Sequence, residues 1–365
     1  MMPLKKITLY TLARWAALFS LLISLLLCLM GNLASSGPTL IAFFLLLSIG
    51  LRDMYSYKGY AFTILIFAAV TTSLFYPHYF TEWNGFKLSG LIIPLLQLIM
   101  FGMGSSMSAN DFIAVVKEPR GVIIGILSQF TIMPTLGFVL AKYSGLPPEI
   151  AAGIVLVGCS PSGLASNVMA YLAKANLALS LTITSCTTLL APFVTPLLMK
   201  LLAGQYIEIN VLNMMFDISK MIILPIIAGL IFNRLLRGNT GWMDKVMPQV
   251  SMFGIAFIIV IITAAGRDSL LNIGPILIFI VLLHNGFGYL LGYWSARLLK
   301  MKEADARTVA IEVGLQNAGL ASGIAKGLGK IATIGLAAGV FGPIMNITGS
   351  MLASYWHKSS PDQTT

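Results

Sequence analysis

Residues 308–323 read TVAIEVGLQNAGLASG and place Glu312, Gln316 and Asn317 inside an otherwise apolar stretch. A carboxylate is expensive inside a membrane segment, and ionisable residues at such positions usually serve a function. Three glycines in the same stretch weaken a helix, and lipid cannot pair with the backbone groups that a break exposes. The stretch therefore predicts an interrupted membrane helix whose break faces protein, water or a ligand.

A second interrupted segment lies earlier in the chain. Residues 158–166 read GCSPSGLAS, with Pro161 between two serines and a glycine on either side of them. Proline removes a backbone donor and clashes with the preceding turn, so the helix is expected to open there. Two interrupted segments in corresponding halves of a membrane protein indicate a transport site.

The whole chain has the composition of an integral membrane protein. It has 365 residues, of which 57% are hydrophobic and only 10% are charged, whereas soluble domains carry about 25% charged residues. Apolar segments suited to crossing a bilayer are predicted at 8–31, 38–51, 59–77, 89–107, 120–141, 149–173, 177–203, 210–233, 247–266, 273–295, 308–325 and 333–355. The second of these segments is short for a full crossing.

The positive residues predict the orientation of the chain. Its formal net charge is +10. Most of the lysines and arginines fall in every second loop between the predicted spans, which places them on the same side of the membrane. This pattern predicts an even number of crossings with both termini in the cytoplasm, and it does not suggest a nucleic acid partner. Residues 1–31 fit a signal peptide as well as an uncleaved helix, and we expect an uncleaved helix.

An internal duplication connects the two interrupted segments. SGLASNVMAYLAKA at 162–175 echoes AGLASGIAKGLGKI at 318–331, which sets an offset of 156 residues. At the same offset, Gln129 lies 37 residues before the GLAS serine of the first segment, and Asn285 lies 37 before that of the second. Five predicted spans separate equivalent positions, and an odd number inverts the second copy, as in many secondary transporters. The alternative is a chance similarity between glycine- and alanine-rich helices, since small residues are frequent at membrane helix contacts.

Polar side chains gather around both interruptions and on two other apolar segments. Their members are Gln129, Ser166, Asn167, Ser180, Thr184, Glu312, Gln316 and Asn317. These side chains offer oxygen atoms and no His/Cys cluster accompanies them, so a hard cation is favoured over zinc, iron or copper. A single carboxylate favours a monovalent ion. Sodium is therefore predicted, with proton coupling through Glu312 as the alternative.

Four longer stretches resemble one known family, the bile acid:sodium symporters. They are GVIIGILSQFTIMP at 121–134, VLVGCSPSGLASNVMAYLAKANLALSLTITS at 155–185, LLHNGFGYLLGYWSARL at 282–298 and TVAIEVGLQNAGLAS at 308–322. The resemblance covers about residues 59–356 and implies a bacterial member of this family. The fold that it implies is an all-α integral membrane transporter with ten helices in two inverted five-helix repeats.

The resemblance also implies a division into domains. A panel domain at 53–108 and 204–268 would move against a core domain at 109–203 and 269–357, which holds two crossing broken helices. Residues 1–52 lie outside the resemblance and are expected to add an N-terminal helix pair. Residues 358–365 would form a C-terminal tail.

The family's binding residues carry over by motif. The first of two sodium sites would consist of Ser166, Asn167, Ser180, Thr184 and Glu312. The second would consist of Gln129, Glu312, Gln316 and the backbone carbonyls of Val313 and Leu315. A substrate pocket is predicted beside these sites, because half-helix N-termini and freed amides there favour an anion. Its residues are Ser162, Gly163, Leu164, Ala165, Asn317 and Asn346. Leu164 and Asn346 depart from the threonine and histidine that the family pattern leads us to expect, which leaves the substrate less defined than the sodium coupling.

The implied function is sodium-coupled symport of a small organic anion, which could be bile-acid-like, pantoate-like or a keto acid. The expected site of action is the bacterial inner membrane, the transported cofactors are two sodium ions, and no protein partner is implied. A proton-coupled transporter and a passive channel are the alternatives. An intramembrane serine hydrolase using Ser162 and His284 is a remote one, since the chain has no G-x-S-x-G elbow.

Overall fold

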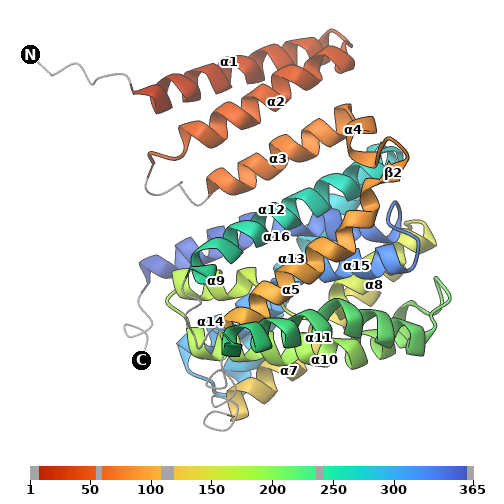
Figure 1. Cartoon of the computed structure of the whole chain (residues 1–365). Coiled ribbons are helices and arrows are strands. Elements are labelled where there is room, and N and C mark those ends of the chain that lie inside the picture. The colour runs from red at the N-terminus through yellow and green to blue at the C-terminus, as the bar shows by residue number, and fades with distance from the viewer. Residues whose placement is uncertain (1–7, 55–59, 108–118, 236–241, 360–365) are drawn as a thin grey trace, which may run out of the picture. The chain divides into compact units, whose positions relative to one another are not determined.

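The computed structural model describes residues 8–54, 60–107, 119–235 and 242–359 (Figure 1). Both termini (1–7 and 360–365, most of the predicted tail) lie outside these residues, and so does the predicted boundary between panel and core at 108/109. The chain divides into two compact units, Met1–Gly85 and Phe86–Thr365. The described residues are almost entirely helical, which confirms the predicted all-α class.

The first unit contains α1 (Leu9–Leu29), α2 (Leu33–Gly50), α3 (Tyr60–Phe75), the short α4 (His78–Thr81) and strand β1 (Glu82–Trp83). Helices α1 and α2 pack together as a hairpin, and α3 packs on α2. Helix α2 has 18 residues and begins five residues before the predicted start at position 38. The reason is a cap, because the Asn32 side chain accepts a hydrogen bond from Ser35 N at 3.4 Å.

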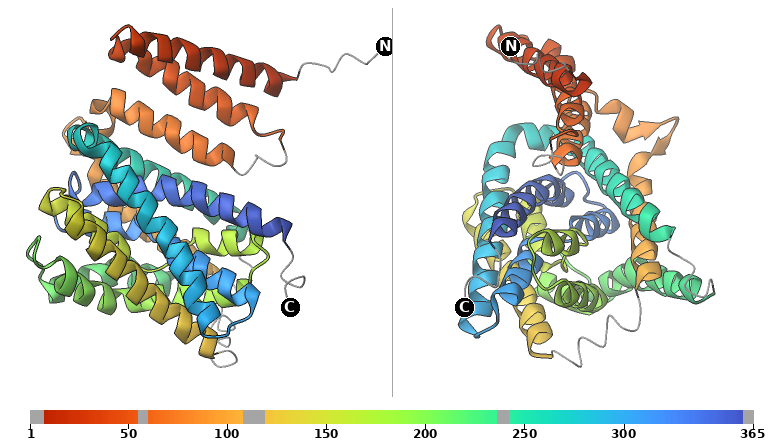
Figure 2. Two further views of the ribbon diagram at one scale, coloured as in Figure 1. Left: turned by 180° about the vertical axis from the view of Figure 1, so that it is seen from behind. Right: turned by 90° about the vertical axis from the view of Figure 1, so that its left-hand side faces the viewer.

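The second unit carries the remaining helices. They are the 3₁₀ helix η1 (Leu88–Leu91) after strand β2 (Phe86–Lys87), and α5 (Ile92–Ser106), α7 (Pro119–Tyr143), α8 (Pro148–Cys159), α9 (Ala165–Leu172), α10 (Leu177–Ala203), α11 (Val211–Leu235), α12 (Met243–Ala265), α13 (Arg267–Leu298), α14 (Glu303–Gly314), α15 (Ala318–Gly327) and α16 (Ile334–Lys358). Helix α5 packs against α11 and α12, whereas α13 packs against α7, α14 and α16 (Figure 2).

Both predicted interruptions are present. Helix α8 ends at Cys159 and α9 begins at Ala165, so the first break coincides with the segment around Pro161. Helix α14 ends at Gly314 and α15 begins at Ala318. The second broken helix begins at Glu303 rather than at the predicted position 308, because its first turn is polar and half-buried, and side-chain pairing holds it instead of apolar packing.

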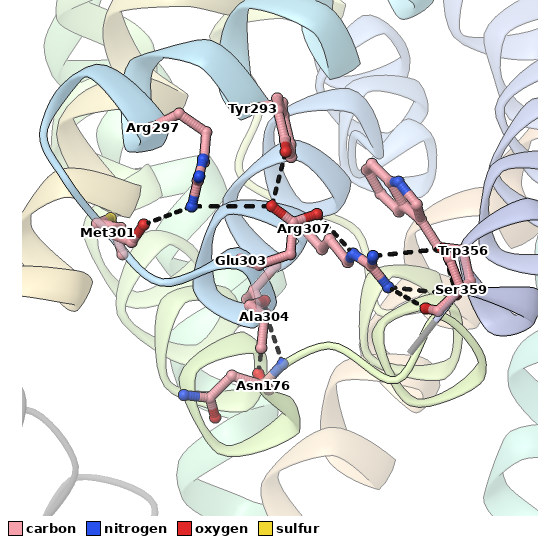
Figure 3. A network of polar contacts seen from close by, with 10 residues as sticks. Asn176, Tyr293, Arg297, Met301, Glu303, Ala304, Arg307, Trp356 and Ser359 are labelled. Atoms are coloured by element: carbon pink, nitrogen blue, oxygen red, sulfur yellow. Dashed lines mark hydrogen bonds and ion pairs between the residues drawn. The ribbon is translucent and has the colours of Figure 1, made fainter. Parts of the chain in front are cut away.

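A buried arginine makes that polar first turn possible. The Arg307 side chain is 3% exposed and pairs with Glu303 at 2.9 Å. It also donates to the carbonyls of Trp356 at 3.2 Å and Ser359 at 2.9 Å, and its guanidinium lies over the Trp356 ring. Figure 3 shows this network, which joins the beginning of α14 to the end of α16. The last carbonyls of α16 thereby gain the charged partner that helix C-termini favour.

The helix boundaries follow the offset expected from the duplicated sequence. Helices α8 and α10 are matched by α14 and α16, and the helices of each pair begin within one position of that offset. The close packing repeats as well. A Cβ atom at Gly158 would overlap the carbonyl of Met133, and a Cβ atom at Gly314 would overlap the ring of Tyr289. Gly314 lies 156 residues after Gly158, and Tyr289 lies 156 residues after Met133, so both contacts follow the offset of the duplication.

Among the described residues, eight helices are long and apolar enough to cross a membrane. The other four predicted crossings correspond to α3, α12 and the two broken helices, whose halves are individually too short. Proteins with many such helices cross the bilayer repeatedly. The chain is therefore a multi-pass membrane protein, as its composition predicts.

Candidate functional site

The two breaks meet within the second unit, where their extended segments, 161–163 and 315–317, pair like two short strands. We call these paired segments the crossing. Ser162 and Gln316 form an antiparallel bridge. Beside it, Gly163 N donates to Leu315 O at 2.8 Å, and Asn317 N donates to Pro161 O at 2.9 Å. Each break therefore satisfies backbone groups of the other, which lipid could not do.

The carbonyls at the end of α8 are paired by side chains from neighbouring helices. Gln129 Nε2, from α7, donates to Ser160 O at 2.9 Å. Thr195 Oγ1, from α10, donates to Cys159 O at 2.7 Å. All of these groups are buried, so an unpaired carbonyl here would carry the full cost of its lost hydration. The first break is consequently held from two sides.

A cluster of side-chain oxygens surrounds the carboxylate of Glu312, which is 0% exposed. Ser180 Oγ lies 2.5 Å from Oε1, and Thr184 Oγ1 lies 2.8 Å from Oε2. Asn167 Oδ1 lies 2.9 Å from the Ser180 hydroxyl and 3.2 Å from that of Thr184. Ser166 Oγ completes the cluster at 3.1 Å from Thr184 Oγ1. The structure thus brings together all five residues of the first predicted sodium site.

Three elements position this cluster. Ser166 and Asn167 lie in the first turn of α9, directly after the break. Ser180 and Thr184 lie one turn apart on α10, and Glu312 lies in the last turn of α14. Among the described residues Glu312 takes part in no ion pair. A buried carboxylate without a positive partner, surrounded only by oxygens, has the chemistry of a hard-cation site.

The residues of the second predicted sodium site also lie together. Gln129 Nε2 lies 2.9 Å from Gln316 Oε1, and Gln316 Nε2 donates to Val313 O at 2.6 Å. Leu315 O accepts from the amide of Gly163 in the crossing. The two amide side chains bond to each other, and this bond leaves Gln316 Oε1 a second lone pair that a cation can use.

Some of the predicted substrate residues lie in the crossing, and the others lie next to it, in a region that we call the rim. Ser162 and Gly163 belong to the crossing, and Ser162 Oγ donates to Glu312 O at 3.0 Å. Asn317 caps α15 through a bond from Leu320 N to its Oδ1 at 2.9 Å.

The other predicted substrate residues lie on the rim. Leu164 and Ala165 are half-buried at the start of α9. Asn346, in α16, donates to Gly342 O at 2.8 Å. A Cβ atom placed on Gly342 would lie 3.7 Å from the Cβ atom of Ala318, at the start of α15. Asn346 therefore lies one helical turn from a contact with the second break.

Two residues at the site are not identified from the sequence. Thr195 is one, although a threonine between two prolines of an apolar helix is a detectable signal. Thr348 is the other, and it donates to Asn285 Oδ1 at 2.5 Å. The hydrolase pair considered above is not formed, because His284 Nε2 lies against Met133 O at 3.0 Å while the Ser162 hydroxyl bonds to α14 and α7.

Sequence comparison agrees with this geometry. Residues 93–273 match the Sodium Bile acid symporter family. An uncharacterized sodium-dependent transporter, YocS of Bacillus subtilis, is 41% identical over 84% of this chain and 94% of its own. The probable sodium/metabolite cotransporter BASS1 of Arabidopsis thaliana chloroplasts is 32% identical over 73% of this chain and 67% of its own. These relatives are named as transporters and not as enzymes, and the chain belongs to the sodium bile acid symporter family of sodium-dependent membrane transporters.

Proposed function

We propose that this protein uses the sodium gradient to import a small organic anion by alternating access. The observation that carries the proposal is the Glu312 carboxylate, which is fully buried and has no basic partner among the described residues. Such a charge needs a cation, and the surrounding hydroxyl and amide oxygens are ligands that sodium accepts. The same carboxylate can release its cation when the surroundings open to water.

Two sodium ions are proposed. The first is bound by the cluster of Ser166, Asn167, Ser180, Thr184 and Glu312. The second is bound by Gln129, Gln316, Glu312 and the carbonyls of Val313 and Leu315. The Gln316 oxygen that accepts from Gln129 keeps a second lone pair for this ion. The first ion connects residues of both broken helices, and the second connects the second broken helix to α7, so sodium binding tightens the packing around the crossing.

The anion is proposed to bind beside the crossing, next to Ser162, Gly163, Leu164, Ala165, Asn317 and Asn346. Helix α9 begins there without a side-chain cap, and helix N-termini favour negative charge. A carboxylate-bearing substrate suits this position because it meets the first amides of α9 on one side and bound sodium on the other. Bile-acid-like, pantoate-like and keto acids all carry that group.

Movement of the panel (53–108 and 204–268) against the core (109–203 and 269–357) would alternate access to the site. Helix α15 of the proposed core packs against α5, α11 and α12 of the proposed panel. This contact surface must separate when the site opens on that side. The positive loops support a position in the bacterial inner membrane with both termini in the cytoplasm.

The test is uptake by proteoliposomes that contain the purified protein. Radiolabelled pantoate, pyruvate and cholate are supplied with an inward sodium gradient, an inward proton gradient or neither. Sodium-dependent uptake of at least one anion, lost in Glu312→Ala, is expected. Equal uptake in a proton gradient without sodium would establish the proton-coupled alternative, and uptake with no gradient dependence would establish a channel.

A further inference from the structure

The carbonyl of Gly314 has a different kind of partner from the other carbonyls of the second break. In a continuous helix it would accept from the amide of Ala318, but that amide donates to Gln316 O at 3.0 Å. The carbonyls on either side of it bond to groups of the two broken helices. Gly314 O instead accepts from Asn285 Nδ2 of α13 at 2.8 Å. One peptide of the break is thus held from outside the crossing.

Asn285 is itself fixed from the opposite side. Its side chain is 0% exposed, and its Oδ1 accepts from Thr348 Oγ1 of α16 at 2.5 Å. The Thr348 hydroxyl also lies 3.3 Å from the hydroxyl of Tyr289, whose ring covers Gly314. These contacts orient the amide so that its donor faces Gly314.

Gln129 does the same at the first break. It is the counterpart of Asn285 in the duplication and lies on α7, the helix that precedes the first broken helix, just as α13 precedes the second. Its amide donates to Ser160 O at 2.9 Å and is also 0% exposed. The duplicated fold has therefore kept one buried amide at each break. Gln129 is a proposed sodium ligand, whereas Asn285 has no role in that proposal.

We propose that Asn285 is a positioning residue for the second sodium site. By holding Gly314 O, it fixes the peptide between Val313 and Leu315, whose carbonyls are the proposed backbone ligands. Gly314 lacks a side chain that could restrain its own dihedrals, so the restraint comes from Asn285 and Tyr289. The inference rests on the proposed sodium coupling and assigns this residue an effect on sodium affinity without direct contact with the ion.

The experiment measures equilibrium binding of ²²Na⁺ to the purified protein, and sodium-dependent uptake in proteoliposomes. Asn285→Leu keeps the volume and removes the donor. It should raise the half-saturating sodium concentration about tenfold, or about 1.4 kcal/mol, with the maximal rate at saturating sodium preserved. Asn285→Gln keeps an amide donor and should recover most of the affinity. Thr348→Val frees the Asn285 amide without removing it, and a two- to threefold weakening is expected, or roughly 0.5 kcal/mol.

Ser322→Ala is the matched control, because the Ser322 hydroxyl is buried in α15 and donates to Ala318 O of its own helix. Its sodium dependence should equal that of the wild type. If Asn285→Leu and Thr348→Val both bind ²²Na⁺ with wild-type affinity, the inference is wrong while the proposed function stands. A lower maximal rate at unchanged sodium affinity would assign Asn285 a purely structural role and also overturn it. Wild-type protein that binds no ²²Na⁺ would overturn the proposed function itself.

Discussion

Replacing Glu312 with glutamine should abolish the thermal stabilisation that sodium gives this protein. The substitution keeps the size of the side chain and removes its charge. Without sodium, wild type must keep a fully buried carboxylate that has only hydroxyl donors, Ser180 at 2.5 Å and Thr184 at 2.8 Å. Glutamine removes the cost of burying that charge, so the variant should be the more stable protein in choline chloride.

With sodium the order should invert. Two unit charges about 4 Å apart attract by about 4 kcal/mol at an effective dielectric constant of 20, and a cation bound by the carboxylate would lie no farther away. Losing this attraction corresponds to a loss of sodium affinity of about a thousandfold. In sodium chloride, wild type should therefore gain stability through binding, whereas Glu312→Gln should gain almost none.

Melting temperatures in detergent provide the assay, recorded in matched series of sodium chloride and choline chloride, together with ²²Na⁺ binding. Glu208→Gln is the control, because it makes the same chemical change at an exposed position and should preserve the sodium response of wild type. A sodium-dependent rise in melting temperature that persists undiminished in Glu312→Gln would refute the reasoning.

Three further predictions concern the crossing and its supports. Gly163→Ala should abolish sodium-dependent uptake, since its Cβ would lie 2.6 Å from the carbonyl of Gln316, while Gly286→Ala, which has open space, should transport normally. Thr195→Val should lower the free energy of unfolding by about 1–3 kcal/mol, because it leaves a carbonyl of the first break unpaired; thermal melts measure this, with Thr195→Ser as the rescue. Arg307→Met should cost about 1–3 kcal/mol, because the carbonyls of Trp356 and Ser359 lose their charged donor, and it should reduce the yield of monodisperse protein in size-exclusion chromatography.

The sequence predicted those features of the site that depend on local chemistry. Pro161 and the glycines around the second break disrupt a helix wherever they occur, so both interruptions could be located from residue types and their order. Ser180 and Thr184 face one side of a helix because of their spacing. Glu312 stands out because a carboxylate is rare in such surroundings. The cluster of these oxygens followed once the two breaks were assumed to cross.

Other features depend on tertiary contacts that no local pattern contains. The bond from Asn285 to Gly314 could be anticipated as an interhelical hydrogen bond but not assigned to a particular carbonyl. The start of α14 at Glu303 depends on Arg307 finding the end of α16, much later in the chain. The substrate cannot be identified from local patterns for a similar reason, since Leu164, Asn317 and Asn346 come from three different helices, α9, α15 and α16.

The pairing of the two breaks has a consequence for biosynthesis. Pro161 O and Gly163 N find their partners on Asn317 and Leu315, which belong to the second repeat. Because roughly 150 residues separate the breaks, the first segment waits roughly 8–30 s for the second at ribosomal rates of about 5–20 residues per second. During that interval the insertion machinery must shelter an opened backbone from lipid. A nascent chain released between the two repeats should consequently be a substrate for membrane quality control.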